Sequence, residues 1–278
     1  MSYQNFIPTV WAEAINRELE RAHVFVEDTN KQYEGSVSKA GDTVRILGVG
    51  KPTITEGIGS DITLVDPEKV ADSSVTMLIN RTAYYNYMID DIDKRQAVGG
   101  VMDALSKEAS EGLAQKQDVA VSQLALSPDA KKLDKTVTTV TADNVLAYLD
   151  KGIQTLYEND VTPSTEITVV VPPWFLTILK QAYTKLDTDN SEMIANGRVG
   201  KYGNVVVKMS NNVATDTDGN SYIQMKTKRA IAFASPMTHV EPYRPEKRFS
   251  DAVKGFVLYG TKIVRPKEMV ILNCKKSA

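Results

Sequence analysis

Residues 255–266 read GFVLYGTKIVRP, and the side chains along this run alternate as they do on a β-strand. A strand has a side-chain period of two, so Leu258 points to one face while Val257 and Tyr259 point to the other. Because both faces have side chains to bury, we expect this strand to carry the fold rather than a ligand. Arg265 stands at the strand end, where an arginine is usually solvated or paired at a surface.

Other short strands surround this run. The residue pattern predicts strands at 205–209, 221–225, 230–234, 239–243, 253–264 and 269–272. Asp218-Gly219 is a typical hairpin-turn pair. Further upstream, residues 167–171 read ITVVV as a buried strand, and Pro172-Pro173 opens a helix directly after it. A strand followed by a helix in this way is an α/β arrangement.

Two more helices precede this strand. Thr141 is placed to cap a helix whose apolar face is spread over 145–156. Before it, apolar residues keep helical spacing across 93–126, and Ser127-Pro128 ends the run. Such a helix is about 50 Å long, well beyond the three or four turns of an ordinary globular helix. Three acidic residues that suit a helix N-terminus lie at its start: Asp90, Asp91 and Asp93.

The fifty residues 34–83 contain no Phe, Trp or Tyr, but they hold six glycines. Strand-like runs lie at 43–49 and 62–65, and a returning strand follows at 74–89. Large aromatic anchors for a core are therefore missing from this part of the chain. We interpret it as a long, twisted hairpin that projects from the body.

An amphipathic pattern opens the chain. Pro8 suits a first helical turn, and apolar residues recur at steps of three and four up to Ala22. This predicts a short helix that either packs on its own domain or forms an arm on a neighbouring subunit. The periodicity alone favours neither interpretation.

Charge and composition exclude several classes of protein. The chain has 278 residues and a formal net charge of −2, which disfavours a dedicated nucleic-acid binder. The N-terminus lacks the pattern of a signal peptide, and no apolar run approaches the roughly 18 residues of a membrane span. A single cysteine, Cys274, cannot form an intrachain disulfide. We expect a soluble intracellular protein with no membrane partner.

Two motifs that suggest ligand binding fail on spacing. Residues 48–51 read GVGK, but the first glycine of a phosphate loop would fall at Arg45, and no hydroxyl residue follows the lysine. Asp216, Asp218 and Gly219 suggest a calcium loop, but the glycine comes two positions early. Turn chemistry explains these residues better.

Catalytic groups are equally scarce. His23 and His239 are the only histidines, and they lie 216 positions apart, which excludes a two-histidine zinc motif. There is no G-x-S-x-G elbow, and Cys274 has no histidine near it in the sequence. A catalytic pair drawn from distant segments stays open. We assign no catalytic, cofactor-binding or metal-binding residue, and we expect a protein that needs no cofactor and is not an enzyme.

Several motifs, in this order, resemble a known family. They are 5–11 (NFIPTVW), 200–207 (GKYGNVVV), 210–213 (SNNV), 241–244 (EPYR), 249–251 (FSD) and 255–266. With the order of arm, long hairpin, long helix and α/β segment, they look like the major capsid proteins of tailed bacteriophages, which have the Hong Kong 97-like coat fold. The resemblance spans nearly the whole chain, although each motif alone is only a strand or turn signature.

The resemblance implies an α+β fold with five parts. These are an N-terminal arm at 1–34, an extended E-loop hairpin at 35–73, a peripheral domain at 74–140 and 236–278 that includes a spine helix at 93–126, and an axial domain at 141–235. It also implies candidate subunit-interface residues, namely Trp11, Ile15, Arg45, Lys51, Glu56, Asp61 and Arg265. Some relatives join subunits through a Lys–Asn isopeptide bond, but nothing near Lys39, Lys51 or Asn273 identifies these residues as partners.

The implied function is that of a major capsid protein that assembles into pentamers and hexamers, forming an icosahedral head shell around double-stranded DNA. Its partners would be copies of itself, a separate scaffolding protein, a portal, and packaged DNA contacted weakly and without sequence specificity. It would reside in the virion after assembly in the bacterial host cytoplasm. Two alternatives stay open: an encapsulin-type nanocompartment shell, which shares the fold but loads enzymes, and an α/β hydrolase or transferase.

Overall fold

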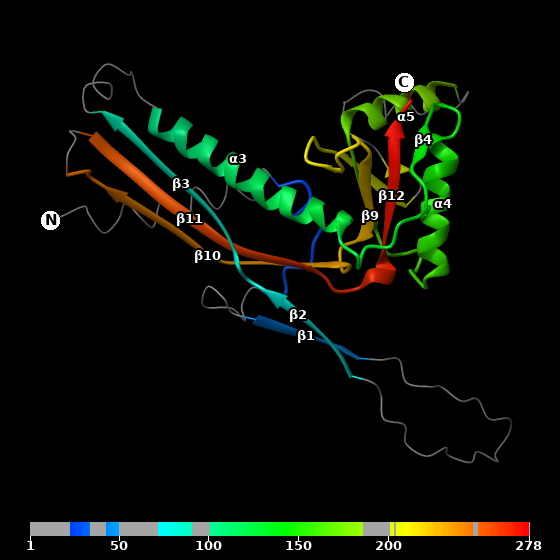
Figure 1. Cartoon of the computed structure of the whole chain (residues 1–278), viewed down its shortest axis with the longest axis horizontal. Helices are drawn as coiled ribbons and strands as arrows, with labels where there is room; N and C mark the ends of the chain where they lie inside the picture. The colour runs from blue at the N-terminus through cyan, green and yellow to red at the C-terminus, as the bar shows by residue number, and fades with distance from the viewer. Residues whose placement is uncertain are drawn as a thin grey trace, which may run out of the picture.

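The computed structural model describes residues 23–33, 43–49, 72–90, 101–185, 201–202, 204–246 and 250–277. These residues form three sheets: a two-stranded hairpin, a three-stranded sheet beside a long helix, and a seven-stranded sheet covered by two shorter helices. In Figure 1 the long helix lies along the three-stranded sheet, and the hairpin extends away below it. The combination of helices and mostly antiparallel sheets agrees with the expected α+β class.

The three-stranded sheet has the antiparallel order β10 (Ile231–Tyr243), β11 (Ser250–Ile263), β3 (Arg81–Asp90). The prediction of two separate strands at 230–234 and 239–243 is wrong, because β10 runs through both. Its register shifts between Ala234 and Met237. Pro236 lies in this shift, where a residue without a backbone N–H does not interrupt the ladder.

The two faces of β11 bury side chains in two different cores, as the alternation at 255–266 predicts. Val257 and Tyr259 belong to the main core, whereas Leu258 packs in a second cluster with side chains of the hairpin. Gly260 allows a close approach here, because a Cβ at this position would lie 2.5 Å from the backbone oxygen of Leu78. The strand is therefore an internal layer between the long helix and the hairpin.

The long helix is α3 (Val101–Ser122), continued by one turn of 3₁₀ helix, η3 (Gln123–Leu126). It ends where Ser127-Pro128 predicts, and its buried side chains include Leu113, Ala114 and Val121. The predicted start at 93 and the acidic residues Asp91 and Asp93 lie outside the described residues. The 22 residues of α3 alone span about 33 Å.

The hairpin consists of β1 (Thr43–Val49) and β2 (Asp72–Leu78), paired antiparallel from Thr43↔Leu78 to Val49↔Asp72. The expectation of one returning strand at 74–89 is wrong, because the chain leaves the hairpin at Ile79 and begins β3 at Arg81. The side chain of Ile79 is fully buried in the cluster around Leu258, so the chain turns into the body at this point. Residues 50–71, with the predicted strand at 62–65, lie outside the described residues.

The seven-stranded sheet has the order β4-β12-β9-β5-β7-β6, and β8 pairs with β9. Its strands are β4 (Thr138–Val140), β5 (Ile167–Val171), β6 (Lys201–Tyr202), β7 (Val205–Met209), β8 (Ala214–Thr215), β9 (Ser221–Thr227) and β12 (Met269–Lys276). The C-terminal strand β12 lies between β4 and β9, whereas the domain division that the resemblance implies places all of 236–278 with the long helix. The short helix η4 (Pro266–Glu268) carries the chain from β11 in one sheet to β12 in the other.

Two helices cover this sheet, α4 (Val145–Glu158) and α5 (Pro173–Lys185), and α5 begins at Pro173 as predicted. The cap predicted at Thr141 is wrong, since α4 begins at Val145 with Asn144 in the cap position. The Oδ1 of Asn144 accepts a hydrogen bond from the backbone N–H of Thr141 at 2.8 Å. Thr141 therefore begins a turn that precedes the helix.

Residues 23–33, which the resemblance places in the N-terminal arm, pack on the body of the same subunit. Phe25 and Val26 are almost fully buried. The carboxylate of Asp118 on α3 accepts hydrogen bonds from the backbone N–H groups of Val24 (2.8 Å), Phe25 (3.1 Å) and Val26 (3.1 Å). Residues 1–22, including the predicted opening helix, lie outside the described residues.

Candidate assembly surfaces

Two of the seven predicted interface residues lie in the described structure. Arg45 is exposed on β1, between the buried Val44 and Ile46, so it points away from the cluster that anchors the hairpin. Arg265 is half exposed at the junction between β11 and η4. The other five lie outside the described residues: Trp11, Ile15, Lys51, Glu56 and Asp61. The structure does not bring Arg45 and Arg265 into contact.

Arg265 lines a groove of about 720 Å³ whose other walls are residues 27–33 and the turn between β9 and β10. Backbone hydrogen bonds hold these walls together. The N–H of Asn30 donates to the carbonyl of Ile231 at 2.9 Å, and the N–H groups of Val264 and Arg265 both donate to the carbonyl of Ala230. The groove is therefore part of the folded framework and lies where the two large sheets meet.

Basic side chains dominate the lining of the groove. They are Lys31, Lys228, Arg229 and Arg265, against the single acidic residue Glu27. Glu27 already pairs with Lys208 at 2.7 Å. This leaves a basic groove that fits a segment carrying carboxylates or another anion.

Glu268 holds the two arginines at the rim. Its carboxylate lies 2.8 Å from Nη1 of Arg265 and 3.6 Å from Nε of Arg229, and it accepts a hydrogen bond from the hydroxyl of Thr227. Burial raises the pKa of Glu268, but the hydrogen bonds from Thr227 and Arg265 and the charge of Arg229 prevail and lower it. Glu268 is therefore ionised at neutral pH and fixes the guanidinium of Arg265 in place.

A buried lysine, which no sequence pattern indicated, supports the wall formed by residues 27–33. Lys226 on β9 is completely buried, and its Nζ donates to the backbone carbonyl of Asp28. Burial lowers the pKa of Lys226 to about 8, although the nearby charge of Asp28 opposes this. Lys226 sits in a strand whose seven residues are all buried, so alternation does not distinguish it from its neighbours.

The residues considered for chemistry have structural roles. The carboxylate of Asp216 accepts hydrogen bonds from the backbone N–H groups of Asp218 (3.0 Å) and Asn220 (2.9 Å), which confirms the turn interpretation. Cys274 lies on the last strand as predicted, and burial raises the pKa of its thiol to about 12. His23 lies 2.6 Å from the side-chain oxygen of Gln117. Among the described residues, no group of three or more His, Cys, Asp or Glu is placed to hold a metal ion.

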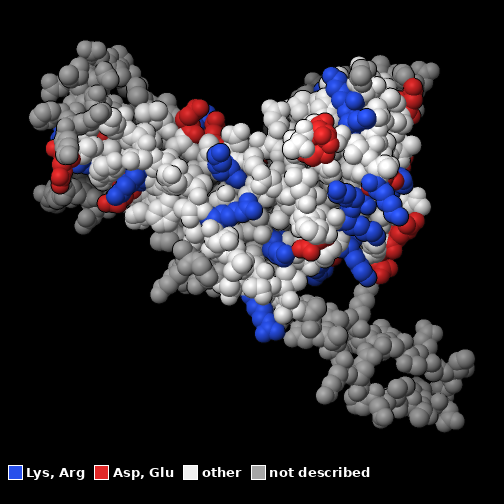
Figure 2. All heavy atoms as spheres, in the orientation of Figure 1, with Lys and Arg blue, Asp and Glu red and all other residues white. Residues whose placement is uncertain are grey.

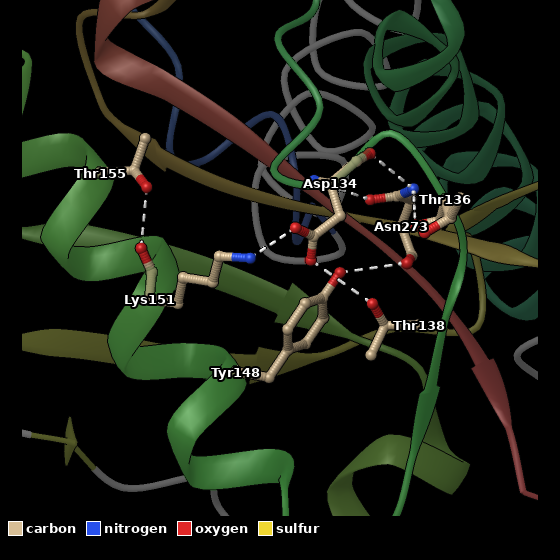
Figure 3. A network of polar contacts seen from close by, with 7 residues as sticks. All are labelled: Asp134, Thr136, Thr138, Tyr148, Lys151, Thr155 and Asn273. Atoms are coloured by element: carbon tan, nitrogen blue, oxygen red, sulfur yellow. Dashed lines mark hydrogen bonds and ion pairs between the residues drawn. The ribbon is translucent and has the colours of Figure 1, made fainter.

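Asn273, considered for an isopeptide bond, is 2% exposed and fully engaged (Figure 3). Its side-chain amide donates to the carbonyl oxygens of Asp134 at 3.0 Å and Thr136 at 2.9 Å. Its backbone oxygen accepts from the hydroxyl of Tyr148 at 3.1 Å. The amide therefore holds the segment before β4 against β12 and is not accessible to a lysine of another subunit.

Comparison with known proteins agrees with this architecture. The sequence matches the family described as phage capsid protein over residues 81–272. No curated protein matches it. No helix among the described residues is long and apolar enough to cross a membrane.

Solved structures resemble the chain over most of its length. A structure of Mycobacterium phage Che8 is 24% identical, covers 90% of each chain and has a TM-score of 0.73. The capsid of Ralstonia phage GP4 is 11% identical, covers 88% of this chain and 85% of that chain, and has a TM-score of 0.66. A virus-like particle from Pyrococcus furiosus is 14% identical, covers 98% of this chain and all of the other, and has a TM-score of 0.58. The chain therefore belongs to the phage capsid protein family and has the Hong Kong 97-like coat fold.

Proposed function

We propose that this chain is the major coat subunit of a phage head, which closes into pentamers and hexamers and forms an icosahedral shell around double-stranded DNA. The observation that carries the proposal is the family match over 81–272 together with similarity to capsid structures across about nine tenths of the chain. The role is structural and needs no catalytic group. The subunit would reside in the virion after assembly in the host cytoplasm, with a scaffolding protein and a portal as further partners.

The seven-stranded sheet with α4 and α5 would be the axial domain, and the three-stranded sheet with α3 would be the peripheral domain. The hairpin rooted at β1 and β2 would be the E-loop. Its residues 50–71 contain four acidic side chains and two lysines, so this stretch has a net charge of −2. We assign the basic groove around Arg265 to contact with an acidic segment of a neighbouring copy.

Assembly would then depend on many weak contacts that close together around each ring. An exposed ion pair contributes only about 0.2–1 kcal/mol, so no single pair holds two subunits together. Repetition around a closed ring turns such contacts into a stable shell. Trp11, Ile15, Arg45, Lys51, Glu56 and Asp61 would add contacts of this kind.

An encapsulin-type shell is the second candidate, favoured by the similarity to the Pyrococcus furiosus virus-like particle. It is less supported, because the TM-score is 0.58 there and 0.73 for the Che8 structure. The contents of isolated particles distinguish the two candidates. A phage head would contain duplex DNA, whereas an encapsulin-type shell would contain a cargo protein. An α/β hydrolase or transferase would instead remain a monomer or small oligomer.

The experiment compares shell formation by wild type, Arg265→Ala and Lys262→Ala, using sedimentation velocity and electron microscopy. Lys262 is a matched control, since it makes one surface ion pair, 2.9 Å from Asp129, near the end of β11 but outside the groove. We expect Arg265→Ala to lower shell yield at least several-fold while its melting temperature stays within about 2 °C of wild type, as for a surface pair. Equal yields from all three proteins would remove the groove from the interface, and failure of wild type to form particles would contradict the function itself.

A further inference from the structure

Six lysines gather around the edge of the seven-stranded sheet that is closed by β4. We call this set the lysine edge, and all its members are exposed: Lys131, Lys132, Lys135, Lys151, Lys275 and Lys276. Figure 2 shows many Lys and Arg side chains over the region of α4 and β12, with several Asp and Glu side chains beside them.

The backbone keeps these lysines together. The segment between η3 and β4 lies beside β12, since Leu133 N–H donates to the carbonyl of Ile271 at 2.8 Å and Ile271 N–H donates to that of Lys131 at 2.9 Å. Further along, β4 pairs in parallel with β12, with Lys275 opposite Thr139. The four residue steps from Ile271 to Lys275 cover about 14 Å of strand. This length corresponds to about four base pairs of duplex DNA.

Two acidic residues of the same region pair with lysines, while the exposed Asp150 accepts a hydrogen bond from the hydroxyl of Tyr202. Asp134 pairs with Lys151, in the network that Asn273 fixes against β12 (Figure 3). Asp129 pairs with Lys262 at 2.9 Å. In the part of the chain that the structure describes, the ion pairs of this region involve Lys151 and Lys262, and none involves the other lysines of the edge at 131, 135, 275 and 276.

Charge is therefore distributed unequally over the molecule. The lysine edge, with its acidic neighbours Asp129, Asp134, Asp143 and Asp150 included, carries a net charge of +2, whereas the whole chain carries −2. The remainder of the chain then carries −4. A net charge close to zero thus conceals one surface that attracts polyanions.

We propose that the lysine edge is the surface through which the coat holds packaged duplex DNA, by contacts to phosphates alone. This inference rests on the proposed function and names the part of the subunit that faces the DNA. Duplex DNA carries one negative charge per about 1.7 Å of its axis, so a strip of lysines about 14 Å long meets several phosphates in any register. Lysine acts as a mobile point charge, whereas arginine forms geometrically specific bidentate contacts. An all-lysine surface therefore suits weak binding without sequence preference.

The test measures binding of full-length subunits to a fluorescent duplex of about 20 base pairs and arbitrary sequence by anisotropy, across a salt titration. The variant Lys131→Gln/Lys132→Gln/Lys135→Gln is compared with Lys107→Gln/Lys116→Gln/Lys254→Gln. The control removes three exposed lysines from α3 and β11, so both variants change the net charge equally. We expect the first variant to bind at least ten-fold more weakly at low salt. Its salt slope should fall by about 0.9 for each phosphate that the variant no longer neutralises.

The control variant should stay within about two-fold of wild type. Equal weakening in both variants would show that only total charge matters and would overturn the proposal, as would unchanged binding in both. Sedimentation of the same proteins examines the competing partner, an acidic surface of a second copy. If the first variant binds the duplex like wild type but no longer assembles, the lysine edge is a contact between subunits. Failure of wild type to assemble would count against the proposed function, while duplex binding would still be measurable on free subunits.

Discussion

Leu258 is the residue at which the hairpin and the body share a core. Its side chain is 3% exposed and packs in the cluster with Met77 and Ile79. We expect Leu258→Ala to lower the free energy of unfolding by about 2–5 kcal/mol, because a buried aliphatic group is removed and a cavity remains. Thermal melting of unassembled subunits measures this. Leu126→Ala is the matched control, since Leu126 is 44% exposed and should cost less than about 0.5 kcal/mol. Similar melting temperatures for the two variants would contradict the internal position of β11.

Lys226 makes stability depend on pH in a predictable direction. Its folded-state pKa is lowered to about 8 by burial, so between about pH 8 and 10.5 the unfolded chain binds more protons than the folded one. Stability contributed by this group therefore rises with pH across that window, by up to about 3 kcal/mol. The buried Cys274 and the buried tyrosines act in the opposite direction, because their folded-state pKa values are raised.

The experiment compares the free energy of unfolding of wild type with that of a Lys226 variant. The contributions of Cys274 and the tyrosines are the same in both proteins and cancel in the difference. Urea unfolding of wild type and Lys226→Met at about pH 7.5 and about pH 10 should show wild type gaining stability relative to the variant as pH rises. Lys228→Met, at an exposed neighbouring position, should track wild type at both pH values. A wild-type minus Lys226→Met difference that is the same at both pH values would show that Lys226 is not desolvated in the folded protein.

Among the elements, the hairpin divides into a root on its own subunit and an outer part that we assign to a neighbour. The root residues Val44, Ile46 and Met77 are buried against β10 and β11 of the same chain. Their backbone amides should exchange slowly with solvent in free subunits. Residues 50–71 should become protected only in assembled shells, a difference that hydrogen exchange with mass spectrometry resolves. Equal protection of 50–71 in both states would rule out an intersubunit contact by this loop.

Local sequence patterns predict the bounds of several strands and helices correctly. The bounds of β1, β5 and β7 agree with the sequence to the residue, because each is a short run rich in β-branched or aliphatic residues. Pro172-Pro173 and Ser127-Pro128 mark helix ends correctly for the same local reason. No local pattern states which sheet a strand joins. The placement of β12 beside β4 and the burial of residues 23–33 against Asp118 depend on contacts about 90 to 140 positions apart, which no local pattern predicts.

The candidate site is less predictable than the fold, and the reason is physical. Arg265 stands out in the sequence because an arginine at a strand end is usually at a surface. The groove around it is formed by three segments that are distant in the sequence. No periodic pattern in the sequence identifies Glu268 as the ion-pair partner of Arg265. The near-neutral total charge hides the lysine edge, because the sequence does not state which lysines share one face.

Taken as a whole, the molecule combines two sheets joined by η4 and a hairpin rooted on one of them. This architecture has a structural role when many copies close on one another. In our proposal, the basic groove would contact the acidic segment 50–71 of a neighbouring copy, and the lysine edge would contact the packaged DNA.

Electron microscopy of the purified, concentrated full-length protein decides whether this chain is the subunit of a closed shell. We expect particles of megadalton mass with rings of five and six copies. Within each copy, density for the three-stranded sheet and α3 should be distinct from density for the seven-stranded sheet. A protein that remains monomeric or dimeric at high concentration, with or without a scaffolding protein supplied in the same cells, would contradict the assignment as a coat subunit.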